Sequence, residues 1–525
     1  MIELPEHYKA LLKIQESSRA KIGLMDKVED EKIDIIDDYW IIPNFSKVQI
    51  RKNVETLEIF YHLIEPGIAQ DEVELLNFIY EDVRRRLVLK DTRIEDEHVK
   101  IRSLLECLDE VLDEYALRLE SELTLKILYY LFRDFFGYGP IDNLLLDPNL
   151  EDISCDGYDI PIYVFHKKYG SLPTNVKLNK EELDSLVLLL SQKSEKHISF
   201  ATPLVDATLP DGSRLQLTYG SDVTTRGSTF SIRKFRTQPF TPIDLMYFGT
   251  LDSRILAYFW LLIENKMNFM VIGETAVGKT TTLNALMMFL PPGAKVVSIE
   301  DTREIQLYHE NWIPSVTRIS IEGKEITMYD LLKTSLRQRP DYIIVGEVRG
   351  KEAQTLFQAM STGHASYSTF HSGDITQLIY RLENEPLNVP RVMIQFLDSV
   401  IVQTLWVSKG VRKRRAREIA EFVGLDPTSK ELLINQLYKW DPVTDTFIQV
   451  SESKKLEKIA TLLGEDINEV INEFNRRREF LELMYSKKIR DYKSVTSLIH
   501  SYYRDPEKAF ETVREWNYSG SKESS

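Results

Sequence analysis

The sequence predicts an α/β protein in which a helical region and a small α/β domain precede a larger C-terminal domain built on a parallel sheet. Three observations carry this prediction. The 525 residues exceed what one hydrophobic core usually supports. Residues 137–235 read as short strands with turn signals, and apolar runs typical of a parallel sheet follow residue 240. The segment "RTQPFTPIDL" lies between them and contains two prolines.

The N-terminal part divides into two segments. Residues 1–40 mix charges with scattered apolar positions, which is compatible with an extension that contacts a partner or with a frayed terminal helix. In residues 41–136 the runs "YWIIPNFSKVQI" and "LEIFYHLI" predict strands, and long helical patterns follow. One helix is expected to pack through a stripe of Leu104, Leu108, Val111, Leu112, Tyr115 and Leu119.

Residues 137–236 are expected to form the small α/β domain, with a helix near Lys180 to Lys196 and a turn at Pro210-Asp211-Gly212. A linker at 237–245, with Pro239 and Pro242, is the expected hinge. The C-terminal domain is placed at 246–515 and ends in a helical region. The polar tail, 516–525, is expected to be disordered.

The composition excludes several classes of protein. The most apolar stretch, Ile255 to Ile263, ends at Glu264, too early to span a bilayer. The N-terminus shows no apolar export signal. Cys107 and Cys155 are too few for a disulfide framework or a four-thiolate zinc module. We therefore expect a cytoplasmic protein without a transmembrane segment.

The net charge of -15 disfavours a general nucleic-acid binder, because a phosphate backbone would be repelled. The segment "KGVRKRRAR", Lys409 to Arg417, is an exception. It is interpreted either as a patch for a polyanion or lipid headgroup, or as a solvated face or subunit contact.

A phosphate-binding motif follows the strand-like run "NFMVI". The text "GETAVGKTT" matches the pattern G-x-x-x-x-G-K-[ST]. Its glycines let backbone N–H groups turn towards phosphates, the lysine reaches the outer phosphates, and the Thr280 hydroxyl binds Mg²⁺. The predicted ligands are ATP and Mg²⁺, and the nucleotide-binding residues are Gly273, Glu274, Thr275, Ala276, Val277, Gly278, Lys279, Thr280 and Thr281.

Three later apolar strands end directly on polar residues. These residues are Glu300, Asp301 and Glu304 after "KVVSI", Gly346, Glu347 and Arg349 after "YIIV", and His371 after "ASYSTF". In a doubly wound sheet, ligands lie beyond the carboxyl ends of the strands, so four strand ends are expected to supply one site.

Two acids have work at such a site: one holds Mg²⁺ through water, and the other orients or deprotonates the attacking water. Glu304 and Glu347 are the candidates, although the second motif of P-loop ATPases commonly ends its strand in Asp rather than in Gly346-Glu347. A neutral imidazole of His364 or His371 could contact the γ-phosphate, whereas an isolated His more often has a structural role.

These motifs carry a resemblance. "GETAVGKTT", "SIEDTREIQL", "DYIIVGEVRG" and "STGHASYSTFHS" resemble the Walker A, Asp box, atypical Walker B and His box of the type II/type IV secretion ATPase superfamily. "PLVDATLPDGSRLQ" and "STFSIRKF" look like its N-terminal domain. "RRAREIAEFVGLDP" looks like its archaeal branch, which includes archaellum and type IV pilus assembly ATPases.

The resemblance implies a RecA-like P-loop fold and roles for individual residues. It makes Glu304 the catalytic base and Glu347 the Mg²⁺-associated acid, and it keeps His371 at the site. The N-terminal domain of this family lends arginines to the nucleotide, and the matching positions are Arg214 and Arg233.

By the same resemblance, six subunits form a ring whose ATP-driven domain motion acts on a polytopic membrane platform protein, at the inner face of the membrane. An accessory ATP-binding regulator is a further implied partner. Which machine is served stays open among archaellum, adhesive pilus and secretion pseudopilus. The rival functions are a conjugative DNA-translocating ATPase, a RecA-like recombinase or helicase, and a nucleotide-gated scaffold with little turnover.

Overall fold

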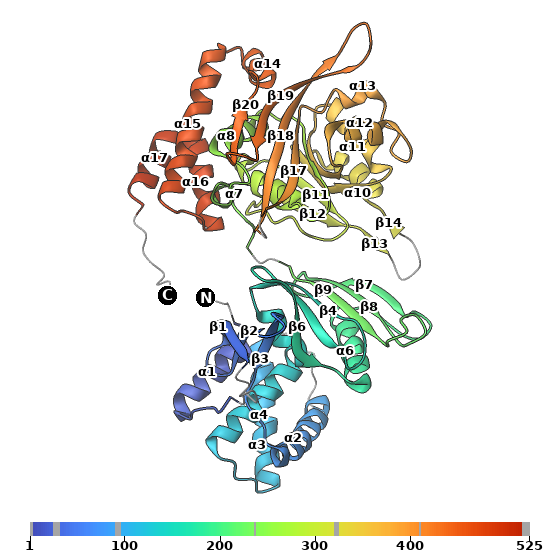
Figure 1. Cartoon of the computed structure of the whole chain (residues 1–525), viewed down its shortest axis with the longest axis vertical. Helices are drawn as coiled ribbons and strands as arrows, with labels where there is room; N and C mark the ends of the chain where they lie inside the picture. Colours follow the sequence, from blue (N-terminus) through green and yellow to red (C-terminus); the bar gives the residue numbers. More distant parts are fainter. Residues whose placement is uncertain are drawn as a thin grey trace. The chain divides into compact units, whose positions relative to one another are not determined.

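The structure is a computed structural model that describes residues 4–24, 32–89, 96–235, 238–319, 325–408 and 411–516. It divides into two compact units, Met1–Phe235 and Arg236–Ser525, called unit 1 and unit 2 here (Figure 1). The expected disorder of the C-terminal tail falls almost entirely outside the described residues.

Unit 1 combines one nine-stranded sheet with helices. Its helices are α1 (Glu6–Ser18), α2 (Gln70–Leu89), α3 (Glu97–Glu114), α4 (Ser121–Phe135), the 3-10 turn η1 (Gly139–Ile141), α5 (Asp142–Leu146) and α6 (Lys180–Lys193). Its strands are β1 (Ile33–Ile42), β2 (Ser46–Asn53), β3 (Ile59–Ile64), β4 (Leu150–Cys155), β5 (Pro161–His166), β6 (Gly170–Lys177), β7 (Leu204–Thr208), β8 (Arg214–Thr218) and β9 (Thr229–Arg233). The sheet order is β1-β2-β3-β6-β5-β4-β9-β8-β7.

A single hydrophobic cluster runs through unit 1, from Tyr8 and Leu11 of α1 to Ile232 of β9. Residues 1–40 are therefore more than an extension: α1 is buried on one side, and the Tyr8 hydroxyl donates to Asp142 Oδ2 at 2.6 Å. The segments expected as two separate subdomains share this core and one sheet, because β3 pairs with β6.

The predicted helical stripe is shorter than expected. Helix α3 buries Leu104, Leu108 and Val111, but it ends at Glu114. Tyr115 is 46% exposed, and Leu119 lies beyond the helix. The pattern continued in the sequence because the next apolar residues belong to the connection that leads into α4.

Unit 2 holds a second nine-stranded sheet and a two-stranded ribbon. Its strands are β10 (Phe269–Gly273), β11 (Val296–Glu300), β12 (Trp312–Val316), β13 (Arg318–Ile319), β14 (Glu325–Ile326), β15 (Tyr342–Val348), β16 (Ala365–His371), β17 (Ser399–Ser408), β18 (Val411–Leu425), β19 (Leu432–Asp441) and β20 (Thr446–Gln449). Its helices are α7 (Pro242–Tyr247), α8 (Ser253–Glu264), α9 (Lys279–Leu286), η2 (Met287–Phe289), α10 (Met328–Ser335), η3 (Leu336–Gln338), α11 (Glu352–Ser361), α12 (Ile375–Glu383), α13 (Arg391–Ile394), α14 (Lys454–Leu463), α15 (Ile467–Ser486), α16 (Tyr492–Arg504) and α17 (Pro506–Arg514).

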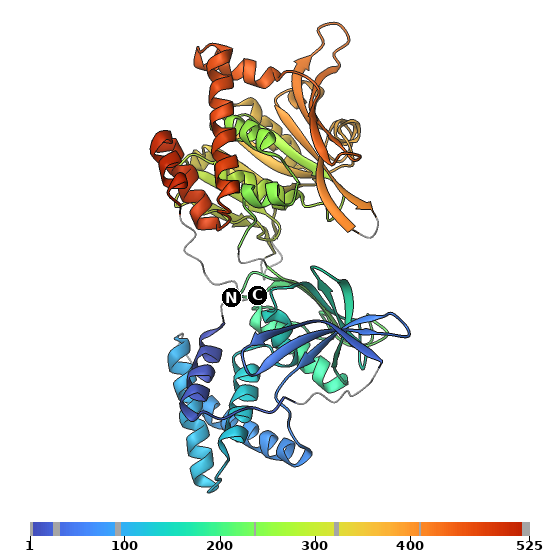
Figure 2. The ribbon, with the colours of Figure 1, turned by 60° about the vertical axis from the view of Figure 1, so that its left-hand side comes forward.

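The sheet of unit 2 has the order β12-β11-β15-β16-β10-β17-β18-β19-β20. The strands from β12 to β17 run parallel, and β17 to β20 are antiparallel. One core cluster joins the sheet to α8, α9 and the C-terminal helices, and another joins it to α10–α13. All five residues of β10 and of β11 are buried, as expected of strands covered on both faces. This arrangement confirms the predicted α/β class and the RecA-like C-terminal domain (Figure 2 shows the C-terminal helices together on one side).

The predicted linker is shorter than expected, because Pro242 is the first residue of helix α7. The Thr241 hydroxyl caps this helix by accepting from the Asp244 N–H, and the Asp244 carboxylate in turn accepts from the Thr241 N–H. Arg490 of the C-terminal region donates to Asp244 at 2.7 Å. Pro242 therefore belongs to the packed body of unit 2.

Candidate functional site

The phosphate-binding loop joins β10 to α9, as its sequence predicts. A Cβ atom on Gly273 would lie 2.6 Å from the Gln403 carbonyl oxygen and 2.6 Å from Val277, so the close approach of β17 requires glycine. Gly278 caps α9 in the left-handed region, with φ of 93°. Ala276 also has a positive φ, 63°, which costs an ordinary residue about 1 kcal/mol.

Lys279 is the first residue of α9, and its Nζ donates to the Glu274 carbonyl oxygen at 2.9 Å. Burial lowers the pKa of Lys279, whereas the charges of Glu347 and Glu304 raise it and that of Arg349 lowers it. The charges that act on this lysine therefore come from the ends of β11 and β15.

Four strand ends meet at one edge of the sheet. Strands β11, β15, β16 and β10 are consecutive neighbours and parallel. Gly273 lies opposite His371, and Ile299 opposite Val345. The structure thus brings the P-loop, Glu304, Glu347 and His371 to the same edge.

Glu300 holds the segment that carries Glu304. Its Oε1 accepts the N–H groups of Glu304 and Ile305, both at 2.9 Å. Glu300 is 2% exposed, and burial raises its pKa to about 7. Its Oε2 is buried and has no hydrogen-bond partner among the described residues.

Glu300 also accounts for the glycine that stands where P-loop ATPases commonly have a strand-end acid. A Cβ on Gly346 would lie 3.0 Å from Glu300 Cγ, which is tighter than most real contacts. Glu300 therefore occupies the space over Gly346, and the acid of this strand is the next residue, Glu347.

Arg349 was expected at this edge as one of the polar residues after its strand, but the sequence assigned it no role. Its NH2 group donates to Glu347 Oε2, and the charges of Glu347, Asp301 and Glu304 raise its pKa. An arginine two residues after a strand-end acid was the available signal in the sequence.

The two histidines of "TGHASYSTFHS" are separated. His371 ends β16 opposite Gly273, whereas His364 precedes β16 at the other end of the strand. Seven extended residues span about 23 Å, so His364 cannot reach a phosphate at the P-loop. The Thr362 hydroxyl lies 3.2 Å from its Nδ1.

His371 borders a shallow depression of about 360 Å³ beside the P-loop. The residues that line it are Glu274, Thr275, His371, Ser372, Gly373, Gln377 and Arg381. Arg381 donates to the His371 carbonyl oxygen and lies over the Phe370 ring, 4.8 Å from its centre. The depression therefore joins the loop after β16 to the first residues of the P-loop.

Arg214 and Arg233 lie in unit 1, directly opposite each other on the antiparallel strands β8 and β9. Both are exposed. Arg233 Nε donates to Asp152 Oδ1 at 3.1 Å. Like charges directly opposite on a sheet repel, so a partly neutralised pair of guanidinium groups favours an incoming anion.

The sequence predicts that Thr280 and Glu347 hold Mg²⁺. Thr280 is the second residue of α9, and Glu347 is near the end of β15 with its side chain 27% exposed. A hydroxyl and a carboxylate that acts through water suit a small cation that keeps several waters, so these residues fit Mg²⁺. Groups of three or more metal-binding side chains do not occur in the described part of the chain.

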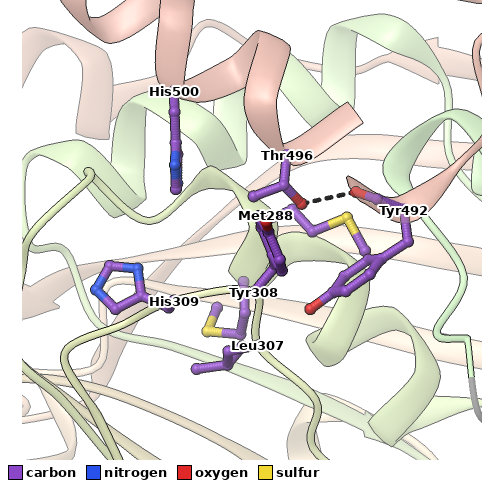
Figure 3. A pocket seen from close by; sticks show the side chains of 8 residues that line it. Met288, Leu307, Tyr308, His309, Tyr492, Thr496 and His500 are labelled. Atoms are coloured by element: carbon purple, nitrogen blue, oxygen red, sulfur yellow. Dashed lines mark hydrogen bonds between the residues drawn. The ribbon is translucent and has the colours of Figure 1, made fainter. Parts of the chain in front are cut away.

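A second cavity lies elsewhere in unit 2, under α16, and encloses about 10 Å³ (Figure 3). His309 and His500 face it, with ring centres 6.3 Å apart, and burial lowers the pKa of His500 to about 4. This volume admits about one water molecule, so the cavity is a packing defect rather than a ligand site.

The chain is similar to several known proteins. The profile of a family described as "Type II/IV secretion system protein" matches residues 176–501. The uncharacterized protein MJ0900 of Methanocaldococcus jannaschii is 39% identical over 384 residues, 72% of this chain and 70% of that protein. The uncharacterized protein MJ1287 of the same archaeon is 47% identical over 263 residues, 48% of this chain and 97% of that protein. The solved structure of the Yersinia pseudotuberculosis ATPase DotB is 18% identical, with a TM-score of 0.40, over 71% of this chain and 93% of that one. None of the described helices is long and apolar enough to cross a membrane.

Proposed function

Because this chain belongs to the type II/IV secretion ATPase superfamily, in its archaeal branch, we propose that it hydrolyses ATP to power the assembly of an archaeal surface filament. The filament is a type IV pilus or an archaellum, and in an archaellum the same motion also drives rotation. One observation carries the proposal: the charges of Glu304 and Glu347 act on Lys279 of the P-loop at the edge where four parallel strands end.

The proposed chemistry divides the work between the two acids. Glu304 orients and deprotonates the attacking water, and the Glu300 carboxylate fixes its backbone. Glu347 and Thr280 hold Mg²⁺, which neutralises the charge of the phosphates when it is bound. Lys279 exchanges the Glu274 carbonyl oxygen for the outer phosphates. Arg349 donates to the Glu347 carboxylate and orients it.

We further propose that Arg214 and Arg233 stabilise the negative charge of the transition state, as the family resemblance implies. Their cross-strand pairing supports this role, since two guanidinium groups on one open face suit a phosphate. In the proposed assembly, six copies form a ring at the inner face of the membrane and act on a polytopic platform protein. Domain motion on hydrolysis supplies the force.

The test is phosphate release from the purified chain with Mg-ATP, alongside Glu304→Gln and Lys279→Ala. We expect turnover by the wild type, normal nucleotide binding without turnover by Glu304→Gln, and weakened binding by Lys279→Ala. Binding without turnover by the wild type would favour the nucleotide-gated scaffold. Turnover that requires added DNA would favour a DNA translocator, a recombinase or a helicase.

A further inference from the structure

The basic segment that ends at Arg417 forms the start of β18, and several of its described side chains contact other parts of unit 2. Lys413 and Arg415 both bind the Asp445 carboxylate, and Arg415 is 5% exposed. Lys409 lies outside the described residues. Lys413 and Arg415 are thus paired within unit 2, whereas Arg412, Arg414 and Arg417 are exposed. The side chains of Arg414 and Arg417 instead donate hydrogen bonds to carbonyl oxygens of two loops.

Arg414 reaches the P-loop. Its Nε donates to the Ala276 carbonyl oxygen at 3.1 Å. Its Cδ would be 3.3 Å from a Cβ on Gly278, so the side chain lies along the glycine that begins α9. The connection is possible because β17, the partner of β18, is also the neighbour of β10, with Gln403 opposite Gly273.

Arg417 reaches the loop after His371. The register of β17 and β18 passes from Gln403↔Ala416 to Val402↔Glu418, which leaves Arg417 as the extra residue of a bulge. Bulges redirect side chains and are common beside functional sites. Arg417 NH2 donates to the Gly373 carbonyl oxygen at 3.0 Å. Gly373 borders the depression that the P-loop residue Glu274 also lines.

We propose that Arg414 and Arg417 are positioning residues that hold the P-loop and the loop after His371 in the arrangement that accepts ATP. The proposal rests on the proposed function, in which the P-loop binds ATP. Neither arginine needs to touch the nucleotide.

The physical reason lies in the backbone of the loop. A P-loop offers its N–H groups to phosphates, so carbonyl groups that turn the other way need donors of their own. The left-handed conformation of Ala276 costs conformational free energy. The hydrogen bond from Arg414 offsets part of that cost in the nucleotide-free protein. A loop that is already ordered loses less entropy on binding. Loss of Arg414 should therefore appear in affinity rather than in chemistry.

The test measures binding of a non-hydrolysable ATP analogue with Mg²⁺ to the full chain by calorimetry. We expect Arg414→Ala to raise the Kd about three- to tenfold, since a charge-assisted bond exposed to water is of modest strength. Its kcat at saturating ATP should stay within about twofold of the wild type. Arg417→Ala should change Kd less and lower kcat about two- to fivefold, because it holds the loop that follows His371.

Arg412→Ala is the matched control, since Arg412 is an exposed arginine of the same strand. It should bind as the wild type does. Equal affinity of Arg414→Ala and the wild type would overturn the proposal, and so would an equal loss in Arg412→Ala, which would assign the effect to net charge. A wild-type chain that binds no ATP would instead contradict the proposed function. Melting temperatures without nucleotide should agree among the variants, which separates positioning from misfolding.

Discussion

Both units contain a nine-stranded sheet, but they present charge in different ways. The central strands of unit 2 are buried on both faces, so their polar groups gather at the carboxyl edge. Strands β8 and β9 of unit 1 bury alternate residues and leave Arg214 and Arg233 on an open face. A doubly covered sheet thus gathers the charges of Glu304 and Glu347 around Lys279 at one edge, whereas a half-covered sheet offers charge outward.

The largest effect is expected from a change in the site at the carboxyl edge of the unit 2 sheet. Glu304→Gln removes the proposed base and should lower kcat by about 100-fold or more, with nucleotide affinity unchanged. Steady-state phosphate release and analogue binding measure the two quantities. Glu310→Gln makes the same chemical change at an exposed position of the same connection, by the amino end of β11, and should retain full activity. Normal turnover by Glu304→Gln would remove this residue from the chemistry.

A smaller effect is expected on the open face of unit 1. Arg214→Ala should lower kcat at least about tenfold without changing the melting temperature, because it removes charge offered to the transition state. Arg226→Ala removes an exposed arginine of the same unit as a control. If Arg214→Ala and Arg226→Ala both turn over ATP at the wild-type rate, the arginines on the open face of unit 1 do not contribute to turnover.

The contact between Glu300 and Gly346 can be tested by stability. Gly346→Ala places a Cβ 3.0 Å from Glu300 Cγ and should lower the free energy of unfolding by about 1–3 kcal/mol. The Glu300→Ala background removes the clashing atom, so the added cost of Gly346→Ala should largely vanish there. Denaturant titration of the wild type, the two single variants and the double variant gives the four free energies of unfolding of this double-mutant cycle. If the two losses of stability simply add, the two residues do not interact.

The smallest effect concerns pH. The folded pKa of Glu300 is raised from 4.5 to about 7, so the folded chain binds this proton more tightly than the unfolded chain. Stability from this group is therefore full below about pH 4.5 and falls as pH rises towards 7. In the wild type, the free energy of unfolding should fall by about 1–3 kcal/mol over this pH window because of Glu300, and Glu300→Gln should remove that fall. Melting temperature against pH measures the difference, and parallel curves would contradict it.

Much of the unit 2 site follows from local sequence. The P-loop and the acids after apolar strands could be placed because each feature lies within one strand and its following turn. The glycine at 346 could be noticed but not explained, since its cause is Glu300 of a neighbouring strand. The same holds for Arg414, which reaches Ala276 across two strand pairings. Sequence patterns describe one strand at a time, whereas these contacts depend on register.

Other features could not be assigned from the sequence for related reasons. A proline after a boundary suggests a linker, but Pro242 is also well suited to the first turn of a helix, and burial decided between the two roles. His364 and His371 are close in the sequence, yet one strand places them at opposite edges of the sheet. Residues 1–40 lacked a clear pattern because α1 has a single short buried face.

The contact between Glu300 and Gly346 also restricts how such a chain can diverge. A side chain at position 346 requires residue 300 to shift or to become smaller, and a replacement without the carboxylate releases the backbone of Glu304. A change to an acid at position 346 that is accommodated by loss of the residue 300 carboxylate would therefore leave the proposed base, Glu304, without its backbone anchor. Related sequences should change these two positions together or keep both.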